Sequence, residues 1–355
     1  MEMLHFTDSI MNKIIIVFSL IVTAYSLKAQ QAYNSSMWMQ SPSIFNAGAV
    51  ATGDEDYSFF TNCRLQYLTM NGSMMRTNSL SAGFKMSDGA YSKNNFGFGI
   101  NVINDQSGDN QLMTNAITIP INYSIQMDER NKLSVGVAPG VYLQSYDPTL
   151  QNWESNWNGS NFNGLGNNTG GDPIFINSTI SRSSYGALDV NAGIHYQHIQ
   201  RNKSRFYSGI AMNHLSRQKI NFTQTGDKLY AQIVINAGAD LATRRKDLKI
   251  QPQMMYFRNG PSNNMIFGIG CEHILESGSA VTNINKSKAF SYAAYYRWND
   301  AVVATINYKF KNFEFGLAFD ANVSRLNSAT SGIGAVELYF KSIHIYRKKK
   351  TKIKK

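Results

Sequence analysis

The sequence predicts an all-β protein: a transmembrane, antiparallel, up-and-down β-barrel of about 14 strands. From Asp54 onward, the chain consists of segments with period-two alternation that are joined by turns of two alternating kinds. One kind is short and basic, as at 128–131, and the other is usually longer and rich in Asn, Gly and Ser, as at 147–186. A membrane barrel sorts its turns in this way because odd and even turns lie on opposite sides of the bilayer. No apolar stretch after residue 30 is long enough for a transmembrane helix.

The N-terminus has the pattern of a secretion signal. A basic start at Met11–Lys13 is followed by the apolar run Ile14–Val22, and a small residue, Ala29, completes the pattern. We expect cleavage after Ala29, so that residues 1–29 form a signal peptide. The alternative is a retained membrane anchor, but the apolar run is shorter than the roughly 20 residues that span a bilayer.

Residues 30–53 precede the first predicted strand. They contain Trp38, Pro42, Phe45 and a run of mostly small residues from Ala47. Such a segment is either a loosely attached periplasmic arm or a plug that is tucked into the barrel. The sequence leaves both interpretations open.

Residues 54–346 are assigned to the barrel. The clearest strand is Ile117–Met127, where large apolar side chains alternate with Thr, Pro, Asn, Ser and Gln. Strict alternation over this length excludes an amphipathic helix, and the small or polar face suits a lumen. Strands are predicted near residues 54–71, 73–86, 95–104, 113–128, 131–146, 187–200, 204–215, 230–243, 246–259, 262–276, 287–297, 301–311, 312–323 and 332–346.

The sorted turns also predict the orientation of the barrel. If the short even turns face the periplasm, both termini are periplasmic and the loop 147–186 is extracellular. The even turns at 87–94 and 277–286 are longer than this rule expects. An error in the strand count is therefore expected at those two places first.

Charged residues on the strands predict a polar lumen. Glu314, Asp320 and Glu337 alternate with Phe, Leu and Val in the last strands. A charge that faces lipid near the midplane costs about 2–4 kcal/mol, so we expect these carboxylates to face inward. The lumen should then be either wet or plugged.

The basic character of the chain is concentrated at its C-terminus. The net charge is +11, and seven of the basic residues lie in the tail 347–355, which begins Arg347, Lys348, Lys349 and Lys350. We therefore expect no nucleic-acid-binding face. The tail is a solvated end, a contact to anionic lipid head groups, or a docking site for an acidic periplasmic partner.

The long loop 147–186 carries aromatic residues among polar ones, including Trp153, Trp157 and Phe162. Exposed aromatics among Asn and Ser favour a recognition surface for a partner, although they would also suit a loop folded over the barrel mouth. Acidic residues in this loop are too sparse for a calcium site.

No constellation of residues predicts catalysis, a metal site or a cofactor. His195 and His198 lie three apart on a strand and face opposite sides, which makes them a poor metal pair. Gly97-Phe98-Gly99 lacks the following helix of a phosphate loop, so its glycines are expected to relieve crowding in the wall.

His214, which ends a strand at the outer rim, is the sole basis for an enzyme hypothesis. Cys63 and Cys271 are expected to be unpaired strand residues rather than a disulfide.

Several segments of the chain resemble, in order, the motifs of the PorP/SprF family of the type IX secretion and gliding-motility apparatus of Bacteroidetes. The resembling segments are Arg64-Leu65-Gln66-Tyr67, Gly97 to Gly108, Leu133 to Gly140, Asn191 to Ile194, Gly209 to Ser216, Tyr296 to Ala301 and Phe319 to Ser324. Asn46-Ala47-Gly48 departs from the family's Asn-Pro-Ala, and the basic tail beyond Tyr346 is a second difference.

The resemblance implies a non-enzymatic outer-membrane barrel that helps to present or retain a cell-surface adhesin and has periplasmic or surface protein partners. It implies no catalytic residues. An outer-membrane solute channel is the alternative, because charged residues are predicted on the lumen face.

Overall fold

The computed structural model describes residues 33–70, 74–87, 94–108, 112–145, 184–219, 228–276 and 287–345. The expected signal peptide lies outside these ranges, as does the basic tail. No helix in the described ranges is both long and apolar enough to cross a membrane.

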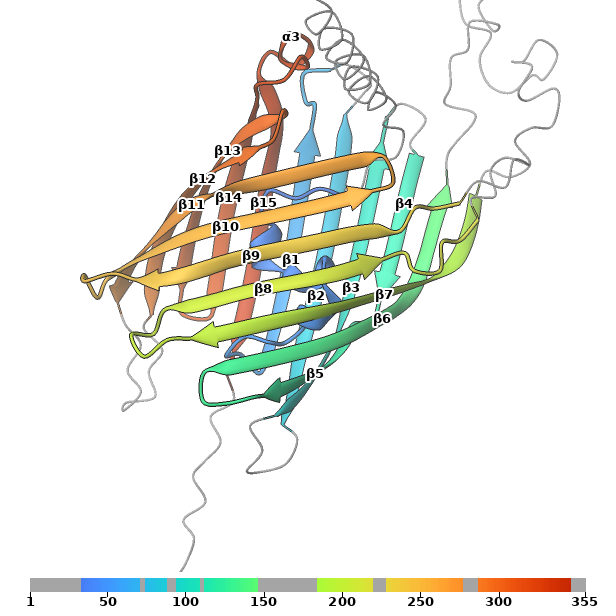
Figure 1. The fold of residues 1–355 in the computed structure, drawn as a ribbon. Coiled ribbons are helices and arrows are strands. Elements are labelled where there is room, and N and C mark those ends of the chain that lie inside the picture. Colours follow the sequence, from blue (N-terminus) through green and yellow to red (C-terminus); the bar gives the residue numbers. More distant parts are fainter. Residues whose placement is uncertain are drawn as a thin grey trace, which may run out of the picture.

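The protein is a closed antiparallel β-barrel, as predicted (Figure 1). Its strands are β1 (Tyr57–Gln66), β2 (Met75–Ser87), β3 (Asn95–Ser107), β4 (Leu112–Thr118), β5 (Ile121–Gln126), β6 (Asn131–Ser145), β7 (Ser184–Ile199), β8 (Arg205–Asn213), β9 (Gln232–Ala242), β10 (Leu248–Asn259), β11 (Ser262–Glu276), β12 (Lys288–Arg297), β13 (Ala301–Phe310), β14 (Phe313–Asn322) and β15 (Ile333–His344). Pairing of β1 with β15 closes the sheet, with Tyr57 opposite His344. Both β4 and β5 pair with β3 and β6, so they are two halves of one wall position and the barrel has 14 strands.

The strand predicted at 113–128 is interrupted at Ile119-Pro120. Proline has no backbone N–H and cannot donate to the ladder, which is the reason for the break. The wall remains bonded there, because Gly99 N donates to Pro120 O (2.9 Å) and Ile119 N donates to Pro139 O (2.9 Å).

The two longer turns on the even side leave the strand count unchanged. Strand β2 ends at Ser87 and β3 begins at Asn95, while β11 ends at Glu276 and β12 begins at Lys288. We call the end of the barrel with these turns the even-turn end. The opposite end, which carries the short helix α3 (Asn327–Thr330), is the odd-turn end.

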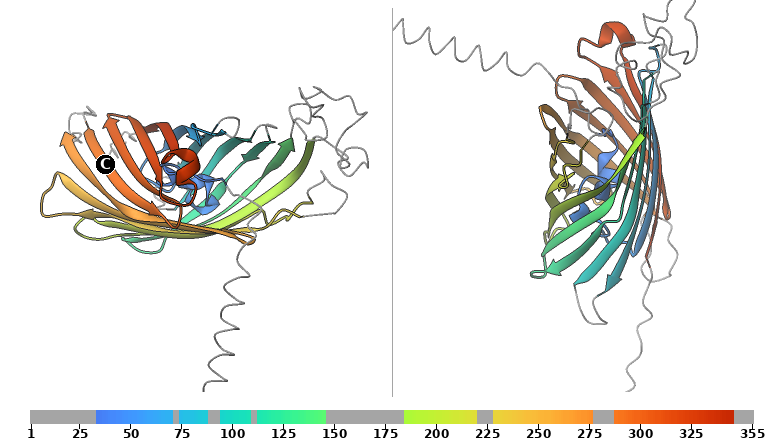
Figure 2. Two further views of the ribbon diagram at one scale, coloured as in Figure 1. Left: turned by 90° about the horizontal axis from the view of Figure 1, so that it is seen from above. Right: turned by 90° about the vertical axis from the view of Figure 1, so that its right-hand side faces the viewer.

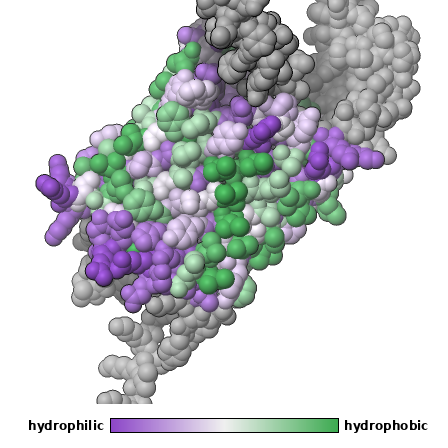
Figure 3. Space-filling model, in the orientation of Figure 1, coloured by the Kyte–Doolittle hydropathy of each residue, from purple (hydrophilic) through white to green (hydrophobic). Residues whose placement is uncertain are grey.

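The barrel is wider than it is deep, and the strands of its front wall cross those of the back wall steeply (Figures 1 and 2). Figure 3 shows apolar side chains across the middle of the front wall and hydrophilic ones toward its ends. Strand β14 shows the underlying alternation: Phe315 is 52% exposed, whereas Asp320 is 1% exposed. The outer face is thus suited to lipid, and the predicted inward position of Asp320 and Glu337 is confirmed.

Residues 33–56, which we call the inner segment, lie inside the barrel (Figures 1 and 2). They form three short 3-10 helices: η1 (Trp38–Gln40), η2 (Pro42–Ile44) and η3 (Ala47–Ala49). Met37, Trp38 and Phe45 are buried in the apolar core, where they join inward-facing residues of the wall such as Val234 and Met255. The lumen is therefore occupied by a folded part of the same chain.

Candidate functional site

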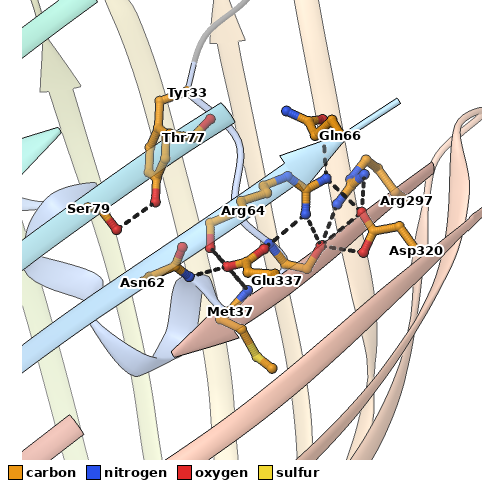
Figure 4. A network of polar contacts seen from close by, with 12 residues as sticks. Tyr33, Met37, Asn62, Arg64, Gln66, Thr77, Ser79, Arg297, Asp320 and Glu337 are labelled. Carbon is orange, nitrogen blue, oxygen red and sulfur yellow. Dashed lines mark hydrogen bonds and ion pairs between the residues drawn. The ribbon is translucent and has the colours of Figure 1, made fainter. Parts of the chain in front are cut away.

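Two arginines and two carboxylates from four strands form a buried ion cluster in the lumen (Figure 4). Arg64 Nη2 lies 2.7 Å from Asp320 Oδ2, and Arg64 Nη1 lies 2.9 Å from Glu337 Oε2. Arg297 Nη1 lies 2.9 Å from the same Asp320 oxygen. All four side chains are at most 3% exposed, so each charge depends on its partners.

The ion cluster holds the beginning of the inner segment. Ser36 Oγ accepts hydrogen bonds from Arg64 Nη1 and Arg297 Nη2, both at 2.8 Å, and donates to Asp320 Oδ1 at 2.7 Å. The backbone N–H of Ser36 donates to Glu337 Oε2 at 2.8 Å. One serine thus contacts three members of the cluster through its hydroxyl and the fourth through its backbone.

Ser35 adds a further contact to Glu337. Its hydroxyl donates to Glu337 Oε1 at 2.5 Å, and Asn62 of β1 donates to the same oxygen. Charge-assisted hydrogen bonds of this kind are the strongest class in proteins. The inner segment is therefore bound to the wall by ionic groups at its start.

Tyrosine hydroxyls near the cluster lie in poorly hydrated surroundings. Burial, followed by the nearby Glu337 charge, raises the pKa of Tyr33, whose hydroxyl donates to Ser79 Oγ at 3.2 Å. Burial, followed by the Asp300 charge, also raises the pKa of Tyr67, which follows β1. A tyrosine hydroxyl is neutral at physiological pH even without such a shift, and the raised pKa extends this neutral state to more alkaline pH.

Amide side chains of the wall bind the backbone carbonyls of the inner segment farther along. Asn101 Nδ2 donates to Ser43 O (2.9 Å), and Asn213 Nδ2 donates to Phe45 O (3.2 Å). Asn122 Nδ2 donates to both Gly48 O (2.9 Å) and Val50 O (2.7 Å). Irregular backbone inside a barrel needs such partners, because its carbonyls have no ladder to join.

Asn46 forms hydrogen bonds both within the inner segment and to the barrel wall. Its Oδ1 accepts from Gly48 N (2.9 Å) and caps η3, while its Nδ2 donates to Ile194 O of β7 (3.0 Å). The residue is 1% exposed. The Asn46-Ala47-Gly48 segment, which differs from the family's Asn-Pro-Ala, thus lies directly against the backbone of the wall.

Glycines make this close contact possible. A Cβ added at Gly136 of β6 would lie 2.6 Å from Ala47 O, and one at Gly97 of β3 would lie 2.6 Å from Val50 O. A Cβ at Gly193 of β7 would overlap Asn46 Oδ1. The predicted role of Gly97 in relieving crowding is confirmed, and the groups that it accommodates are the Asn122 side chain of β5 and the inner segment at Val50.

Replacing Gly193 with Val is expected to displace the inner segment, because the new side chain would occupy the place of the Asn46 carboxamide. The measurement is limited proteolysis of the purified protein in detergent, with cleavage mapped to residues 33–56. Gly270→Ala is the matched control, since a Cβ at Gly270 would meet only side chains or backbone of the wall, at 3.1 Å or more. Equal protection of the segment in both variants would contradict the close-packing argument.

A cavity of about 980 Å³ lies in the lumen between the inner segment and the even-turn end. The inner segment forms one side from Met39 to Glu55, and inward residues of the wall form the rest. It reaches the even-turn end, where Lys311, Asn312 and Ile345 line it. The lumen is thus filled in one part and hollow in the other.

His214, the basis of the enzyme hypothesis, has an acidic and a hydroxyl neighbour. Its Nδ1 lies 2.8 Å from Asp189 Oδ2, and Ser216 Oγ lies within hydrogen-bond distance of two acceptors, Gln218 Oε1 at 2.7 Å and Asp189 Oδ1 at 3.2 Å. A serine nucleophile would need a hydrogen bond to the imidazole base, but here both groups bind the same carboxylate. The backbone of His214 is left-handed (φ 59°), and its N–H donates to Asn191 Oδ1 at 2.8 Å. This arrangement fixes the end of β8 and does not form a catalytic triad.

The residues that were predicted as a partner-binding site are not the ones that form the ion cluster. Trp153, Trp157 and Phe162 lie outside the described residues, as do Arg347, Lys348, Lys349 and Lys350. His195 is buried, while His198 Nδ1 contacts Asn131 Oδ1 at 2.7 Å, so these two histidines have separate surroundings. Cys63 and Cys271 are free, as predicted.

The ion cluster and its contacts were missed by the sequence analysis, although a signal for them was present. Arg64, Arg297 and Asp320 all lie within segments that resemble the family motifs. These motifs are far apart in sequence and meet in the lumen, around Ser35 and Ser36.

The model of the family described as type IX secretion system membrane protein PorP/SprF matches residues 27–341. No curated protein matches the sequence. Among solved structures, the CymD monoaromatic hydrocarbon channel aligns with a TM-score of 0.46 at 10% identity, covering 90% of this chain and 95% of that one. The toluene transporter TodX of Pseudomonas putida aligns with a TM-score of 0.44 at 10% identity, covering 88% and 93%. A FadL homologue of Pseudomonas aeruginosa aligns with a TM-score of 0.46 at 8% identity, covering 85% and 94%.

The family match confirms the resemblance that was drawn from the sequence motifs. Because it extends over most of the chain, the protein belongs to the PorP/SprF family of type IX secretion system membrane proteins.

Proposed function

We propose that this outer-membrane barrel binds a cell-surface adhesin that the type IX system exports, helps to export or anchor it, and contacts periplasmic components of that system. The observation that carries the proposal is the family match over residues 27–341. The occupied lumen supports it: the inner segment is held by the ion cluster and by wall amides. A barrel built in this way is suited to holding a partner rather than to passing solutes.

The proposal places the two ends of the barrel in different compartments. The even-turn end, with both described termini of the barrel wall, faces the periplasm, and the odd-turn end faces outward. On this orientation the loop with Trp153, Trp157 and Phe162 contacts the adhesin. The tail beginning Arg347, Lys348, Lys349 and Lys350 contacts periplasmic components or anionic lipid.

The solute-channel alternative rests on the polar residues of the lumen. The inner segment opposes it, because Trp38, Phe45 and Val50 are buried within the barrel and leave a cavity on one side of the segment. We therefore expect no stepwise conductance from the intact protein.

Deletion of the gene is expected to abolish surface display of one class of adhesin, because the barrel that retains it would be missing. The measurement is labelling of intact cells with antibodies against exported surface proteins, together with assay of the culture medium for released adhesin. Re-expression of the intact gene should restore display. Unchanged display and secretion in the deletion strain would refute the proposed function.

A further inference from the structure

The cavity at the even-turn end contains buried polar groups without partners. Asn236 of β9 is 4% exposed, and neither its Nδ2 nor its Oδ1 has a hydrogen-bond partner among the described residues. Nδ1 of His195, on β7, is also unpartnered, and both residues line the cavity. Leaving a buried amide without hydrogen bonds is unfavourable, so these groups point to a ligand that would satisfy them.

Three lysines line one side of the same cavity: Lys309 of β13, Lys311 of the following turn and Lys341 of β15. The ammonium of Lys311 lies 4.9 Å from the centre of the exposed Phe310 ring, so it is already engaged there. None of the three lysines has a carboxylate within ion-pair distance among the described residues. Glu314 lies opposite both Lys309 and Lys341 in the strand register, but it accepts its hydrogen bond from Tyr339 Oη at 2.6 Å. Lys309 and Lys341 thus give the cavity a cationic side whose ammonium groups are available to a ligand.

The other charged residues that line the cavity include two ion pairs and two carboxylates of the inner segment. Arg205 Nη2 is 2.7 Å from Asp240 Oδ2, and Lys249 Nζ is 3.0 Å from Glu272 Oε1. Asp54 and Glu55 of the inner segment also line the cavity, but their charges act on Lys132 of β6 and Arg205 of β8, on strands other than those of Lys309 and Lys341. The tail 347–355 is a poor occupant, because its seven basic residues would meet the three lysines.

We propose that the cavity receives an acidic polypeptide segment that enters from the even-turn end. Lys309 and Lys341 bind its carboxylates, while Asn236 and His195 bind its backbone. A volume of about 980 Å³ is at the upper end of the range for ligand pockets, and amide-rich walls match the donors and acceptors of a peptide. The choice of a polypeptide rests on the proposed function, in which the barrel contacts other proteins of the secretion system.

The test uses the full-length protein in detergent and a short fluorescent peptide of alternating Glu and Ser, with binding measured by fluorescence anisotropy. Lys309→Ala/Lys341→Ala is expected to weaken binding at least about tenfold, because two charge-assisted contacts are lost. Arg244→Ala/Lys246→Ala is the matched control: it removes two positive charges from an exposed turn at the same end. Binding in this variant should be unchanged.

A peptide of alternating Gln and Ser separates charge recognition from general peptide binding and should bind weakly. Equal binding of the Glu and Gln peptides would overturn the proposal, as would equal loss in the two double variants, which would indicate a diffuse basic rim. Migration of unheated and heated samples on gels verifies that each barrel is folded. If the peptide fails to bind while gene deletion still abolishes adhesin display, the cavity proposal fails and the proposed function stands.

Discussion

Deleting residues 33–52 is expected to turn the barrel into an ion-conducting channel. The wall closes through β1 and β15 without help from the inner segment, so the barrel itself should still form. The inner segment fills one part of the lumen with Trp38, Phe45 and Val50, and removal of residues 33–52 exposes polar side chains of the wall such as Asn101 and Asn122. A wall with this lining would hold water and pass ions, as in open barrels.

The measurement is single-channel current in planar bilayers, with the intact protein as the reference. Ser35→Gly/Ser36→Gly is the graded variant: it removes the hydroxyl contacts to Glu337 and Asp320 but retains the segment. Brief openings are expected from this variant and sustained openings from the deletion. If the deleted barrel folds and does not conduct, the inner segment is not what closes the lumen.

Strand positions could be predicted from the sequence because the alternation of each strand is a local property. Fourteen segments were expected and 14 strand positions are present, with the even and odd turns in the expected places. The interruption at Pro120 was missed because alternation continues through it: Ile117, Ile119 and Ile121 all point outward. The alternation of apolar and polar residues shows only which way the side chains point. The interruption at Pro120 arises from the backbone, because proline has no N–H to donate.

The position of the inner segment could not be predicted in the same way. Its short 3-10 helices have no period that a sequence pattern would reveal. The contacts that hold it join residues that are far apart in the chain: Ser36 and Asp320 are separated by 284 positions. The inward position of Asp320 and Glu337 was predicted from the free-energy cost of a charge that faces lipid. Their partners Arg64 and Arg297 lie on other strands, so the pairs could be assigned only from the three-dimensional arrangement of the closed barrel.

Replacing Arg64 with Met is expected to destabilise the barrel by about 3–5 kcal/mol, because the buried Glu337 would lose its arginine partner, whereas Asp320 would keep Arg297. The measurement is urea unfolding in lipid vesicles, followed by tryptophan fluorescence. Arg258→Met is the matched control: this arginine is exposed and its Nε donates to the backbone oxygen of Gly260, so little change is expected.

The charge argument can be separated from the loss of side-chain volume by a second substitution. In Arg64→Met/Glu337→Gln, one positive and one negative charge are removed together, and Arg297 still pairs with Asp320. Recovery of part of the lost stability is expected, since the double variant no longer buries an uncompensated carboxylate. Arg64→Lys should also recover part of it, although a single ammonium cannot reproduce the two-pronged contact to Asp320 and Glu337. If the double variant is less stable than Arg64→Met by the full cost of Glu337→Gln alone, the two residues are not coupled. The inner segment would then be held mainly by the wall amides and glycines rather than by the ion cluster.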